Sequence, residues 1–550
     1  TMTSFKSAQL IANSRDADKV IFLMDRIELG TQSLLEYRGF ADENEEVQAT
    51  ENTGVLITKL KSDDPANTLI VTSIQKMSNI KAEGDLKEKD IQIMNSKRIV
   101  FIVDECHRST FGDMLTTIKD TFPSAIFFGF TGTPIQDENQ KKLNTTATVF
   151  GDEIHRYSIA DGIRDRNVLG FDPYKVLTYS DNDLRKAIGL EQSKASCVEK
   201  ALADPVKAAI FNRIMRELKM YGYRDDSGEY IKGIEDYIST SQYQRIEHQN
   251  AVVDDIVENW LTLSQNSKYH AIFATSSIPE AIQYYRLFKE KAVSLKVTAL
   301  FDPNIDNNGG VKFKEDGLVE LITDYNARYG QDFSLQTHDK LKKDIALRMA
   351  HKKPYERIEK EKDQQIDLLI VVDQMLTGFD SKWINTLYLD KVLRYENIIQ
   401  AFSRTNRLAG PDKPFGTVKY YRYPHTMEQN IIKAVKLYSG DRPFGLFVER
   451  LDINLTKMNQ VFEDISALFK NAGIDSFSKL PDNKTERGKF AKLFNSFNDH
   501  LEAAKIQDFK WNKLDYDFEK NEMKICIHVN INETIYLTLV QRYKELLGGG

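Results

Sequence analysis

Two neighbouring carboxylates, Asp104 and Glu105, follow a short apolar run in the first quarter of the chain. Residues 99–103 are continuously apolar, which predicts a buried strand that presents the residues after it at the carboxyl end of a sheet. Those residues are Asp104, Glu105, Cys106 and His107. Mg²⁺ takes one or two carboxylates and keeps most of its waters, so Asp104 suits the metal shell and Glu105 suits the orientation and deprotonation of a water. A helix N-cap explains an acidic residue at this position about as well.

Hydroxyl and guanidinium groups follow other apolar runs. The next run ends in Thr131 and Thr133, which places two hydroxyls on a turn beside the carboxylates. Gln400, Arg404 and Arg407 are spaced i, i+4 and i+7, which predicts one face of a helix. A planar guanidinium suits the charge that develops on a transferred phosphoryl group. Two arginines at helical spacing are more often ordinary surface charge, so they are informative only together with the other motifs.

Short apolar runs that alternate with amphipathic stretches position all of these residues. The first series of runs lies at residues 20–24, 69–72, 99–103 and 125–130, and the second at 271–274, 297–301, 368–372, 386–389 and 418–421. Such runs are typical of strands buried on both faces of a parallel sheet, so the sequence predicts two α/β domains in tandem. From about Met427 helical periodicity dominates, which predicts an all-α C-terminal domain. The predicted domains are residues 1–153, 154–426 and 427–550.

The composition fits a multidomain globular protein. Of its 550 residues, 41% are hydrophobic and 28% are charged, and the formal net charge is −6. Roughly 150 residues per domain gives three or four domains, and no apolar stretch approaches the roughly 20 residues of a membrane helix. The three cysteines lie outside any metal-ligand spacing, so we expect a reducing, cytoplasmic setting. The acidic balance argues against a protein that coats nucleic acid through bulk positive charge, but a local basic groove stays open.

The order and spacing of the motifs resemble those of superfamily 2 helicases. The segments 104–107 and 131–134 resemble motifs II and III, and their pairing is far more specific than either segment alone. The segments 377–380 and 400–407 resemble motifs V and VI, the latter with its paired arginine fingers. The resemblance implies an ATP site with Mg²⁺, in which Thr1 and Asp104 hold the metal through water and His107 couples the site to the rest of the motor. The implied catalytic residues are Asp104, Glu105, His107, Gln400, Arg404 and Arg407, and the implied ATP-binding residues are Thr1, Asp104, Thr131, Thr133, Gly378 and Asp380.

The same resemblance implies that loops at other strand ends bind DNA. Asp25 and Arg26 resemble motif Ia, the segment 72–76 resembles the next DNA-facing motif, and the segment 274–276 closes a strand as motif IV does. Threonine hydroxyls and backbone N–H groups on such loops typically hold phosphates. The implied DNA-binding residues are Arg26, Thr72, Gln75, Lys76, Thr275, Ser276 and Thr377.

Residues 377–407 narrow the resemblance to one family. The elements Gly-Phe-Asp, Leu-Tyr-Leu-Asp-Lys and Gln-Ala-Phe-Ser-Arg-Thr-Asn-Arg look like the restriction (R) subunit of type I restriction-modification enzymes. The similarity spans essentially the whole chain. It implies an ATP-dependent translocase of double-stranded DNA, built from two RecA-like domains and a helical domain that docks on a methyltransferase core. The implied partners are the methyltransferase and specificity subunits of the same complex.

Two departures from the family pattern matter. Ser403 stands where motif VI usually has glycine, a small change that we expect to be tolerated. A Walker A loop, G-x-x-x-x-G-K-[ST], should precede the first helix, and only Thr1 remains of it as the Mg²⁺-binding hydroxyl. We therefore expect the chain alone to bind ATP poorly. No run presents a nuclease core, so we expect the cleavage residues of the whole protein to lie upstream.

Two other functions use the same motifs. A stand-alone superfamily 2 DNA repair or remodelling helicase would lack a nuclease fold upstream of these residues. A scaffold that binds DNA or partner subunits without hydrolysis is disfavoured, because degenerate motors usually lose the carboxylates or the arginines first. This chain retains Asp104, Glu105, Arg404 and Arg407.

Overall fold

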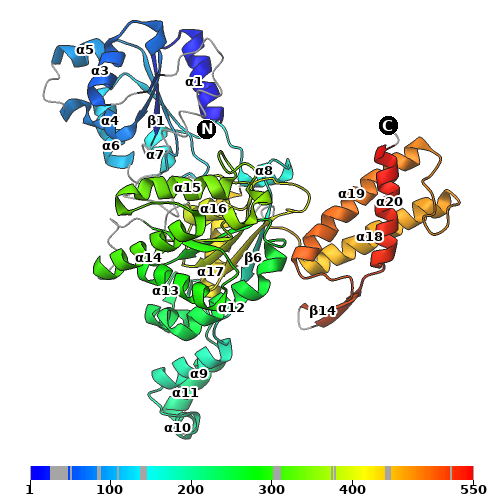
Figure 1. The fold of residues 1–550 in the computed structure, drawn as a ribbon. Coiled ribbons are helices and arrows are strands. Elements are labelled where there is room, and N and C mark those ends of the chain that lie inside the picture. The colour runs from blue at the N-terminus through cyan, green and yellow to red at the C-terminus, as the bar shows by residue number, and fades with distance from the viewer. Residues whose placement is uncertain are drawn as a thin grey trace. The chain divides into compact units, whose positions relative to one another are not determined.

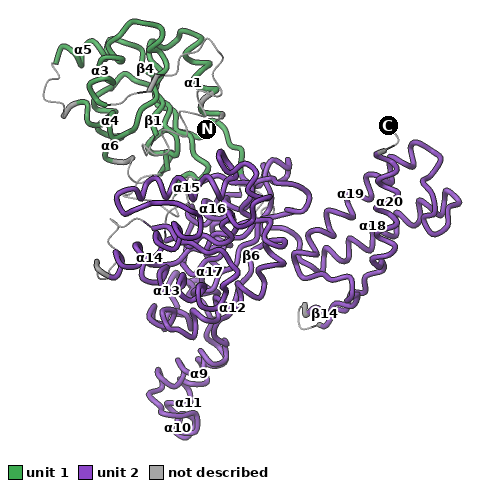
Figure 2. The backbone as a smooth tube through the Cα atoms, in the orientation of Figure 1, with its two compact units in different colours: residues 1–158 green, residues 159–550 purple. Residues whose placement is uncertain are grey.

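The chain forms two compact units, residues 1–158 and residues 159–550 (Figure 2). The computed structural model describes residues 2–24, 48–49, 52–82, 88–107, 111–136, 145–301, 311–372, 376, 379–439, 447–520 and 523–548. Each unit contains one parallel sheet covered by helices (Figure 1). The tandem α/β organisation predicted from the sequence is confirmed.

The sheet of the first unit has five parallel strands in the order β2-β3-β1-β4-β5. The strands are β1 (Lys19–Met24), β2 (Gln48–Ala49), β3 (Leu69–Ser73), β4 (Ile99–Val103) and β5 (Ile126–Gly129). In the register of the sheet, Leu23 near the end of β1 pairs with Thr72 of β3 and with Val103 of β4. The residues that follow β1, β3 and β4 therefore emerge together at one edge of the sheet.

Alternate side chains of β1 and β4 enter two separate cores. One core lies against α3 (Thr53–Lys61), α4 (Ile74–Ser78), α5 (Glu88–Asn95) and α6 (Phe111–Thr121), and it receives Ile21, Leu23, Phe101 and Val103. The other lies against α1 (Met2–Ser14), and it receives Val20, Phe22, Val100 and Ile102. α7 (Thr146–Phe150) contacts β5. Burial on both faces explains why these strands are apolar without interruption.

The sheet of the second unit has six parallel strands in the order β10-β11-β9-β12-β13-β6. The strands are β6 (Phe171–Lys175), β9 (His270–Thr275), β10 (Val297–Leu300), β11 (Leu368–Val371), β12 (Ile384–Asp390) and β13 (Gly416–Tyr420). The helices that accompany it are α8 (Ile159–Arg164), α12 (Ile246–Leu263), α13 (Ile278–Lys291), α14 (Val311–Tyr329), α15 (His338–Ala350), α16 (Glu396–Phe402) and α17 (Pro424–Tyr438). The earliest strand, β6, completes the sheet at the edge beside β13.

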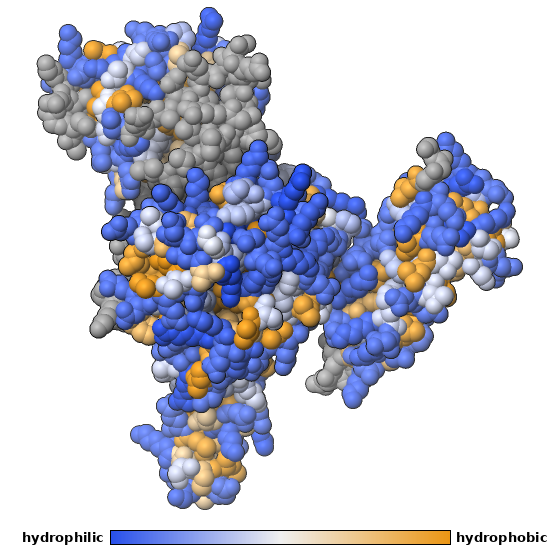
Figure 3. Space-filling model, in the orientation of Figure 1, coloured by the Kyte–Doolittle hydropathy of each residue, from blue (hydrophilic) through white to orange (hydrophobic). Residues whose placement is uncertain are grey.

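A small helical lobe, residues 181–237, lies in the chain between β6 and β9. It contains α9 (Asp181–Gln192), α10 (Val198–Ala203), α11 (Pro205–Arg216) and the antiparallel hairpin of β7 (Tyr223–Arg224) and β8 (Tyr230–Ile231). The lobe has its own apolar cluster, which includes Ile188, Ile214 and Ile234. Apolar side chains also appear on its surface (Figure 3), and Leu202 and Val206 are among the exposed ones.

The C-terminal region is helical, as predicted, but it also contains a hairpin that the sequence analysis missed. Its helices are α18 (Leu451–Asn471), α19 (Lys484–Ile506) and α20 (Glu533–Gly548), and the hairpin joins β14 (Asp515–Lys520) to β15 (Met523–His528). The prediction of an all-α domain is corrected in this respect, because Tyr516, Phe518 and Ile527 pack against the helical core. Within the described ranges, no helix is long and apolar enough to cross a membrane.

Candidate functional site

The turn after β4 holds the two carboxylates at the carboxyl edge of the first sheet. The turn consists of Asp104, Glu105, Cys106 and His107. The Asp104 N–H donates to the Leu23 carbonyl at 3.1 Å, and the Cys106 N–H donates to the Phe130 carbonyl at 3.1 Å. Glu105 has a φ of +49°, a left-handed conformation that costs an L residue about 1–2 kcal/mol. The neighbouring strands thus fix Glu105, whose side chain is 54% exposed and open to water.

His107 connects this turn to the end of β5. Its ring is buried, and its Nδ1 lies 2.7 Å from Thr131 Oγ1 and 3.4 Å from the Glu105 carboxylate. The Thr131 hydroxyl oxygen also accepts a hydrogen bond from the Thr133 N–H at 3.0 Å. Residues from two separate sequence motifs therefore meet in one group. We call Glu105, His107 and Thr131 the carboxylate–histidine–threonine group.

Close packing between Cys106 and Gly129 holds the two strand ends together. A Cβ added at Gly129 would lie 2.8 Å from Cys106 Sγ and 2.9 Å from the Phe150 ring, so the contact requires a glycine. Burial raises the pKa of the Cys106 thiol to about 12, and the nearby carboxylates add to the shift. A thiol with such a pKa is a poor nucleophile, so Cys106 has a packing role.

The candidate DNA-binding residues of the first unit follow β3. Thr72 is 3% exposed, whereas Gln75 is exposed and Lys76 is half-buried. Ser73 caps α4, because its hydroxyl oxygen accepts from the Lys76 N–H at 3.3 Å. The side chains of Gln75 and Lys76 thus reach the surface and that of Thr72 lies inside, and their contact with DNA stays a prediction. Arg26, predicted to bind DNA, lies outside the described residues, as does Thr1, predicted to bind ATP and Mg²⁺.

The corresponding candidates of the second unit, Thr275 and Ser276, follow β9. Thr275 is fully buried, and its hydroxyl lies 3.3 Å from the carbonyl oxygens of Val371 and Ser277. The half-buried Ser276 donates its hydroxyl to the Asp390 carbonyl at 3.0 Å. Both hydroxyls therefore join neighbouring strand ends of the sheet, and their contact with DNA also stays a prediction.

A buried ion cluster behind this edge was not identified from the sequence. Asp390, the last residue of β12, accepts hydrogen bonds from His248 at 2.9 Å, from Tyr284 at 2.8 Å and from Arg422 at 3.0 Å. Arg422 also donates to Glu280 at 2.7 Å. Burial alone raises the pKa of Asp390, but the bonds from His248 and Arg422 outweigh it and hold this pKa below its usual value. The cluster ties α12 and α13 to the strand ends. In the sequence it is indicated only by two charged residues, Asp390 and Arg422, which follow apolar runs.

The prediction that Gln400, Arg404 and Arg407 share one helical face is wrong. α16 ends at Phe402 with Ser403 as its C-cap, so only Gln400 lies in the helix. The N–H groups of Arg404 and Thr405 bond to the carbonyls three residues back, which closes the helix with a turn. The physical reason is that Thr405 is fully buried and turns the chain into the core of the unit.

Both arginines nevertheless contact the same loop, which follows β11. The Arg404 guanidinium donates to the Phe379 carbonyl, and its Nε donates to the Gln400 carbonyl at 3.1 Å. Arg407 Nε donates to the Asp380 carboxylate at 2.7 Å, and both of these side chains are about half exposed. The loop thereby holds both guanidinium groups. Thr377 and Gly378, predicted to bind DNA and ATP, lie outside the described residues.

Lys413, a buried lysine that was not predicted from the sequence, supports the backbone of Arg407. Lys413 is 1% exposed, and its Nζ donates to the carbonyls of Lys382, Ile384 and Arg407 at 2.9, 2.7 and 2.9 Å. Burial lowers the pKa of Lys413 to about 7. These three contacts hold the backbone of Arg407 against the start of β12. Nothing in the local sequence distinguishes this lysine from one at the surface.

Three family models match successive parts of the chain. The SWI2/SNF2 ATPase model matches residues 1–202, the model of type I restriction enzyme subunit R domain 3 matches residues 267–423, and the model of the type I restriction and modification enzyme subunit R C terminus matches residues 446–548. The chain belongs to the type I restriction enzyme R subunits. The first match covers the sheet of the first unit, the second covers most strands of the second sheet, and the third covers the C-terminal helices and their hairpin.

Two curated relatives agree with this assignment. The endonuclease subunit of a type I restriction enzyme of Staphylococcus aureus (strain COL) is 36% identical over 439 residues, which cover 77% of this chain and 40% of that protein. The corresponding subunit of Staphylococcus saprophyticus is 37% identical over 449 residues, which cover 80% of this chain and 42% of that protein. The solved fragment of a putative HsdR subunit from Vibrio vulnificus YJ016 is similar with 13% identity and a TM-score of 0.42, over 82% of this chain and 61% of that one. The R-subunit chain spans about two fifths of the length of these curated relatives.

Proposed function

We propose that the R-subunit chain is the motor of a type I restriction endonuclease and that it uses ATP to translocate double-stranded DNA. The observation that carries this proposal is the carboxylate–histidine–threonine group at the carboxyl edge of the first sheet. A carboxylate linked through a buried ring to a second strand end can pass a change at a bound phosphate to the rest of the unit. Such a link suits an enzyme that couples hydrolysis to movement.

The residues at this edge fit a nucleotide bound with Mg²⁺. Asp104 is half-buried and Glu105 is half-exposed, so they offer the one or two carboxylates that Mg²⁺ takes beside phosphates and water. When bound, Mg²⁺ neutralises charge on the phosphates. Asp104, together with Thr1, would hold the metal shell, and Glu105 would orient and deprotonate the water that attacks the terminal phosphate. Thr131, Thr133, Gly378 and Asp380 complete the proposed ATP-binding set.

Arg404 and Arg407 act as the arginine fingers of the same reaction, with Gln400 as a further catalytic residue. A guanidinium is always charged and planar, so it stabilises the charge that spreads over the transferred phosphoryl group. The loop after β11 holds both groups, since Arg404 contacts Phe379 and Arg407 contacts Asp380. Movement of that loop would therefore move both arginines together and couple hydrolysis to conformational change.

Double-stranded DNA is the proposed substrate of the movement, and the loops after the strands are the proposed contacts. Arg26, Gln75, Lys76, Ser276 and Thr377 would hold phosphates with side chains, whereas the buried Thr72 and Thr275 would position backbone N–H groups. We further propose a cytoplasmic complex in which the C-terminal helices dock on the methyltransferase and specificity subunits. DNA cleavage belongs to a nuclease domain upstream of these residues.

Glu105→Gln tests this function, because the amide keeps the shape of the side chain and removes the base. In the complete subunit assembled with its partners, we expect DNA-stimulated ATP hydrolysis to fall by about 10² to 10⁴. Binding of the Mg²⁺-nucleotide should persist. Both are measured directly, as phosphate release with and without duplex DNA and as titration of a fluorescent nucleotide. Glu191→Gln, at an exposed position of α9, is the matched control.

Two outcomes would contradict the proposal. Loss of nucleotide binding in step with hydrolysis would remove the role of Glu105 as base. An unaltered assembly whose ATP hydrolysis does not respond to duplex DNA would remove the motor function itself.

A further inference from the structure

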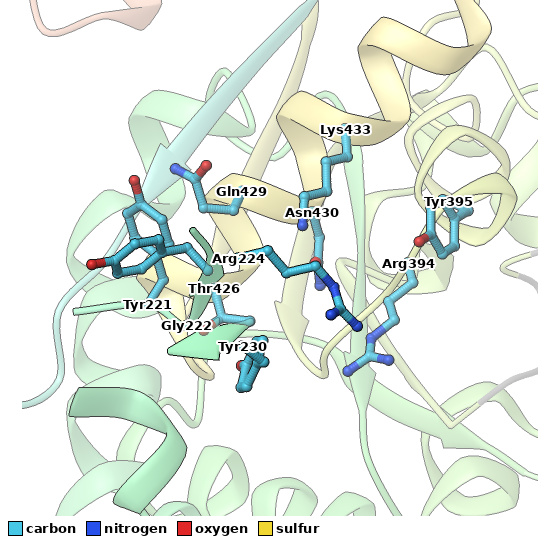
Figure 4. Close-up of a pocket in the computed structure, with 11 residues that line it drawn as sticks. Tyr221, Gly222, Arg224, Tyr230, Arg394, Tyr395, Thr426, Gln429, Asn430 and Lys433 are labelled. Carbon is cyan, nitrogen blue, oxygen red and sulfur yellow. The ribbon is translucent and has the colours of Figure 1, made fainter. Parts of the chain in front are cut away.

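A cavity of about 670 Å³ opens at the carboxyl edge of the second sheet, apart from all the predicted ATP and DNA residues (Figure 4). Three elements form it: the hairpin β7–β8 of the helical lobe, the segment that follows β12, and the first turns of α17. Each contributes one cation to the lining, namely Arg224, Arg394 and Lys433. The lining also contains four tyrosines, and it contains no carboxylate.

The cations of this cavity have few partners of their own. Among the residues that the structure describes, neither the Arg394 guanidinium nor the Lys433 ammonium group forms an ion pair or a side-chain hydrogen bond. Within the described ranges, the Arg224 guanidinium donates to the Gly228 carbonyl at 2.7 Å and to no other group. The cavity therefore carries positive charge that the protein does not neutralise with a carboxylate on its wall.

The carboxylates next to the cavity accept hydrogen bonds from its surroundings. Glu235 accepts hydrogen bonds from the backbone N–H groups of His425 and Thr426 at the start of α17, at 2.9 and 2.7 Å. Asp236 accepts from the Tyr230 hydroxyl at 3.0 Å and from the Gly233 N–H at 2.8 Å. These bonds fix the hairpin and the helix around the cavity, and they leave its three cations facing solvent.

The side chains of Arg224 and Arg394 point toward one another from opposite walls (Figure 4). Burial raises the pKa of Tyr230 and Asp236 raises it further, while Arg394 and Arg224 both act in the opposite direction, so both guanidinium groups lie near this hydroxyl. Two like charges that converge repel each other, and the Asp236 carboxylate that accepts from this hydroxyl forms no ion pair with either guanidinium group within the described ranges. A bound anion would turn this repulsion into attraction.

The remaining wall is made of the side chains that proteins use on nucleic-acid backbones. Hydrogen bonds to phosphate oxygens come from arginine, lysine, tyrosine, threonine, asparagine and glutamine, and the cavity presents all six types. Its uncharged members include Thr426, Gln429 and Asn430 on α17. Arg394 lies four residues after Asp390, whose carbonyl holds the predicted DNA-binding residue Ser276. The cavity thus extends the edge on which DNA is expected.

We propose that this cavity binds phosphates of the sugar-phosphate backbone of double-stranded DNA, through Arg224, Arg394 and Lys433. The proposal rests on the motor function proposed above and adds a contact supplied by the helical lobe. A free nucleotide offers the same phosphate chemistry. Pockets for small ligands usually bury about 70–90% of the ligand, whereas all three cations here are exposed, which fits a polymer passing over the surface.

The test replaces cations singly, as Arg394→Ala and Lys433→Ala. Lys436→Ala is the matched control, because Lys436 lies one turn further along α17 and does not line the cavity. Binding of a fluorescein-labelled duplex is followed by anisotropy between about 50 and 200 mM salt, where each phosphate contact contributes about 0.9 to the slope of log affinity against log salt. We expect the slope to fall by about one in each cavity variant and to stay unchanged in the control.

The outcomes separate this proposal from the motor function. Unchanged slopes in Arg394→Ala and Lys433→Ala, with duplex binding intact, would overturn the cavity assignment and leave the motor function standing. Loss of ATP or inorganic phosphate binding in these variants, with an unchanged DNA slope, would assign the cavity to a small anion and also overturn the proposal. An unaltered protein that binds no duplex would overturn both.

Discussion

Thr131 shows how one hydroxyl can connect two strand ends. Its oxygen accepts from the Thr133 N–H at 3.0 Å and lies 2.7 Å from His107 Nδ1, which in turn lies 3.4 Å from the Glu105 carboxylate. His107 is buried, so water competes weakly for this contact. If a phosphate bound there as proposed, displacement of Glu105 would reach the loop after β5 through the contacts of His107 Nδ1.

Thr131→Val keeps the shape of this side chain and removes the bond. In the complete subunit, we expect ATP hydrolysis without DNA to change by less than about tenfold, because Asp104 and Glu105 remain in place. Stimulation by duplex DNA should be lost. The measurement is the hydrolysis rate as a function of duplex concentration, with Thr117→Val on the exposed face of α6 as control. Full stimulation in Thr131→Val would show that the bond carries no coupling.

The sequence located the residues of this group but not their contacts. Asp104, Glu105 and Thr131 were identified because each follows an apolar run, and parallel strands place such residues at one edge. The distance from His107 to Thr131 depends on how closely β4 and β5 approach, which Gly129 permits by leaving room for Cys106. That contact joins residues over twenty positions apart and has no periodic signal.

The element that carries Arg404 and Arg407 is a loop rather than a helix. Asp380 holds Arg407, and the Phe379 carbonyl holds Arg404, so the orientation of both groups depends on the segment after β11. The spacing of the arginines matched a helix, but the burial of Thr405 decided the backbone. The spacing of the arginines could not reveal this, because the burial of Thr405 depends on packing against the rest of the unit.

Arg407→Ala removes one proposed finger and leaves the loop in place. Loss of an arginine finger costs about 10³ to 10⁵ in rate, so we expect ATP hydrolysis and translocation to fall by that order in the complete subunit. Duplex binding should survive. Arg216→Ala, at an exposed position of α11, is the control and should behave as the unaltered protein. An Arg407→Ala subunit that translocates at the normal rate would exclude the finger role.

A histidine pair makes the start of β9 sensitive to acid. His270 Nδ1 lies 2.5 Å from the Ile366 carbonyl, which only accepts, so His270 Nε2 accepts from the His351 Nε2–H at 2.8 Å. The His351 ring also stacks on Trp383, with 4.1 Å between the ring centres. Burial lowers the pKa of His270 to about 3 and that of His351 to about 4. Both rings are therefore neutral in the folded protein at neutral pH.

Stability should fall as the pH drops below about 6.5, where the unfolded chain takes up protons that the folded chain refuses. The loss continues toward the folded values near 4 and 3, at up to about 1.4 kcal/mol per group for each pH unit. Thermal unfolding at pH 7 and pH 5 measures it. His351→Gln lacks one titrating ring and should show a smaller drop in Tm between these pH values. An identical drop would exclude the pair as the cause.

At the scale of the whole molecule, the sequence predicted the two sheets but not how the helical lobe is attached. Uninterrupted apolar runs indicate strands buried on both faces of a sheet, so the tandem order of the two α/β sheets could be predicted from the sequence. The lobe is attached through Glu235, which bonds to the start of α17, and the bond between His248 and Asp390 holds α12 nearby. These contacts join residues more than 140 positions apart. The hairpin β14–β15, in contrast, could be predicted from the sequence, because apolar residues alternate at 516, 518, 525 and 527.

Because β6 is held in the second sheet by its pairing with β13, cleavage of the chain between β6 and the other strands should leave the sheet assembled. β6 pairs with β13 over five residues although some 240 positions separate them, and Thr178 bonds His248 across the lobe at 2.8 Å. A protease that cleaves the tip of the hairpin, at residues 225–228, would sever the backbone between β6 and every other strand of its sheet. We expect the two fragments to migrate as one species in native gel filtration and to separate only in denaturant. The peptide bond at that tip is dispensable for holding the halves together, so the protein could be expressed as two complementing pieces.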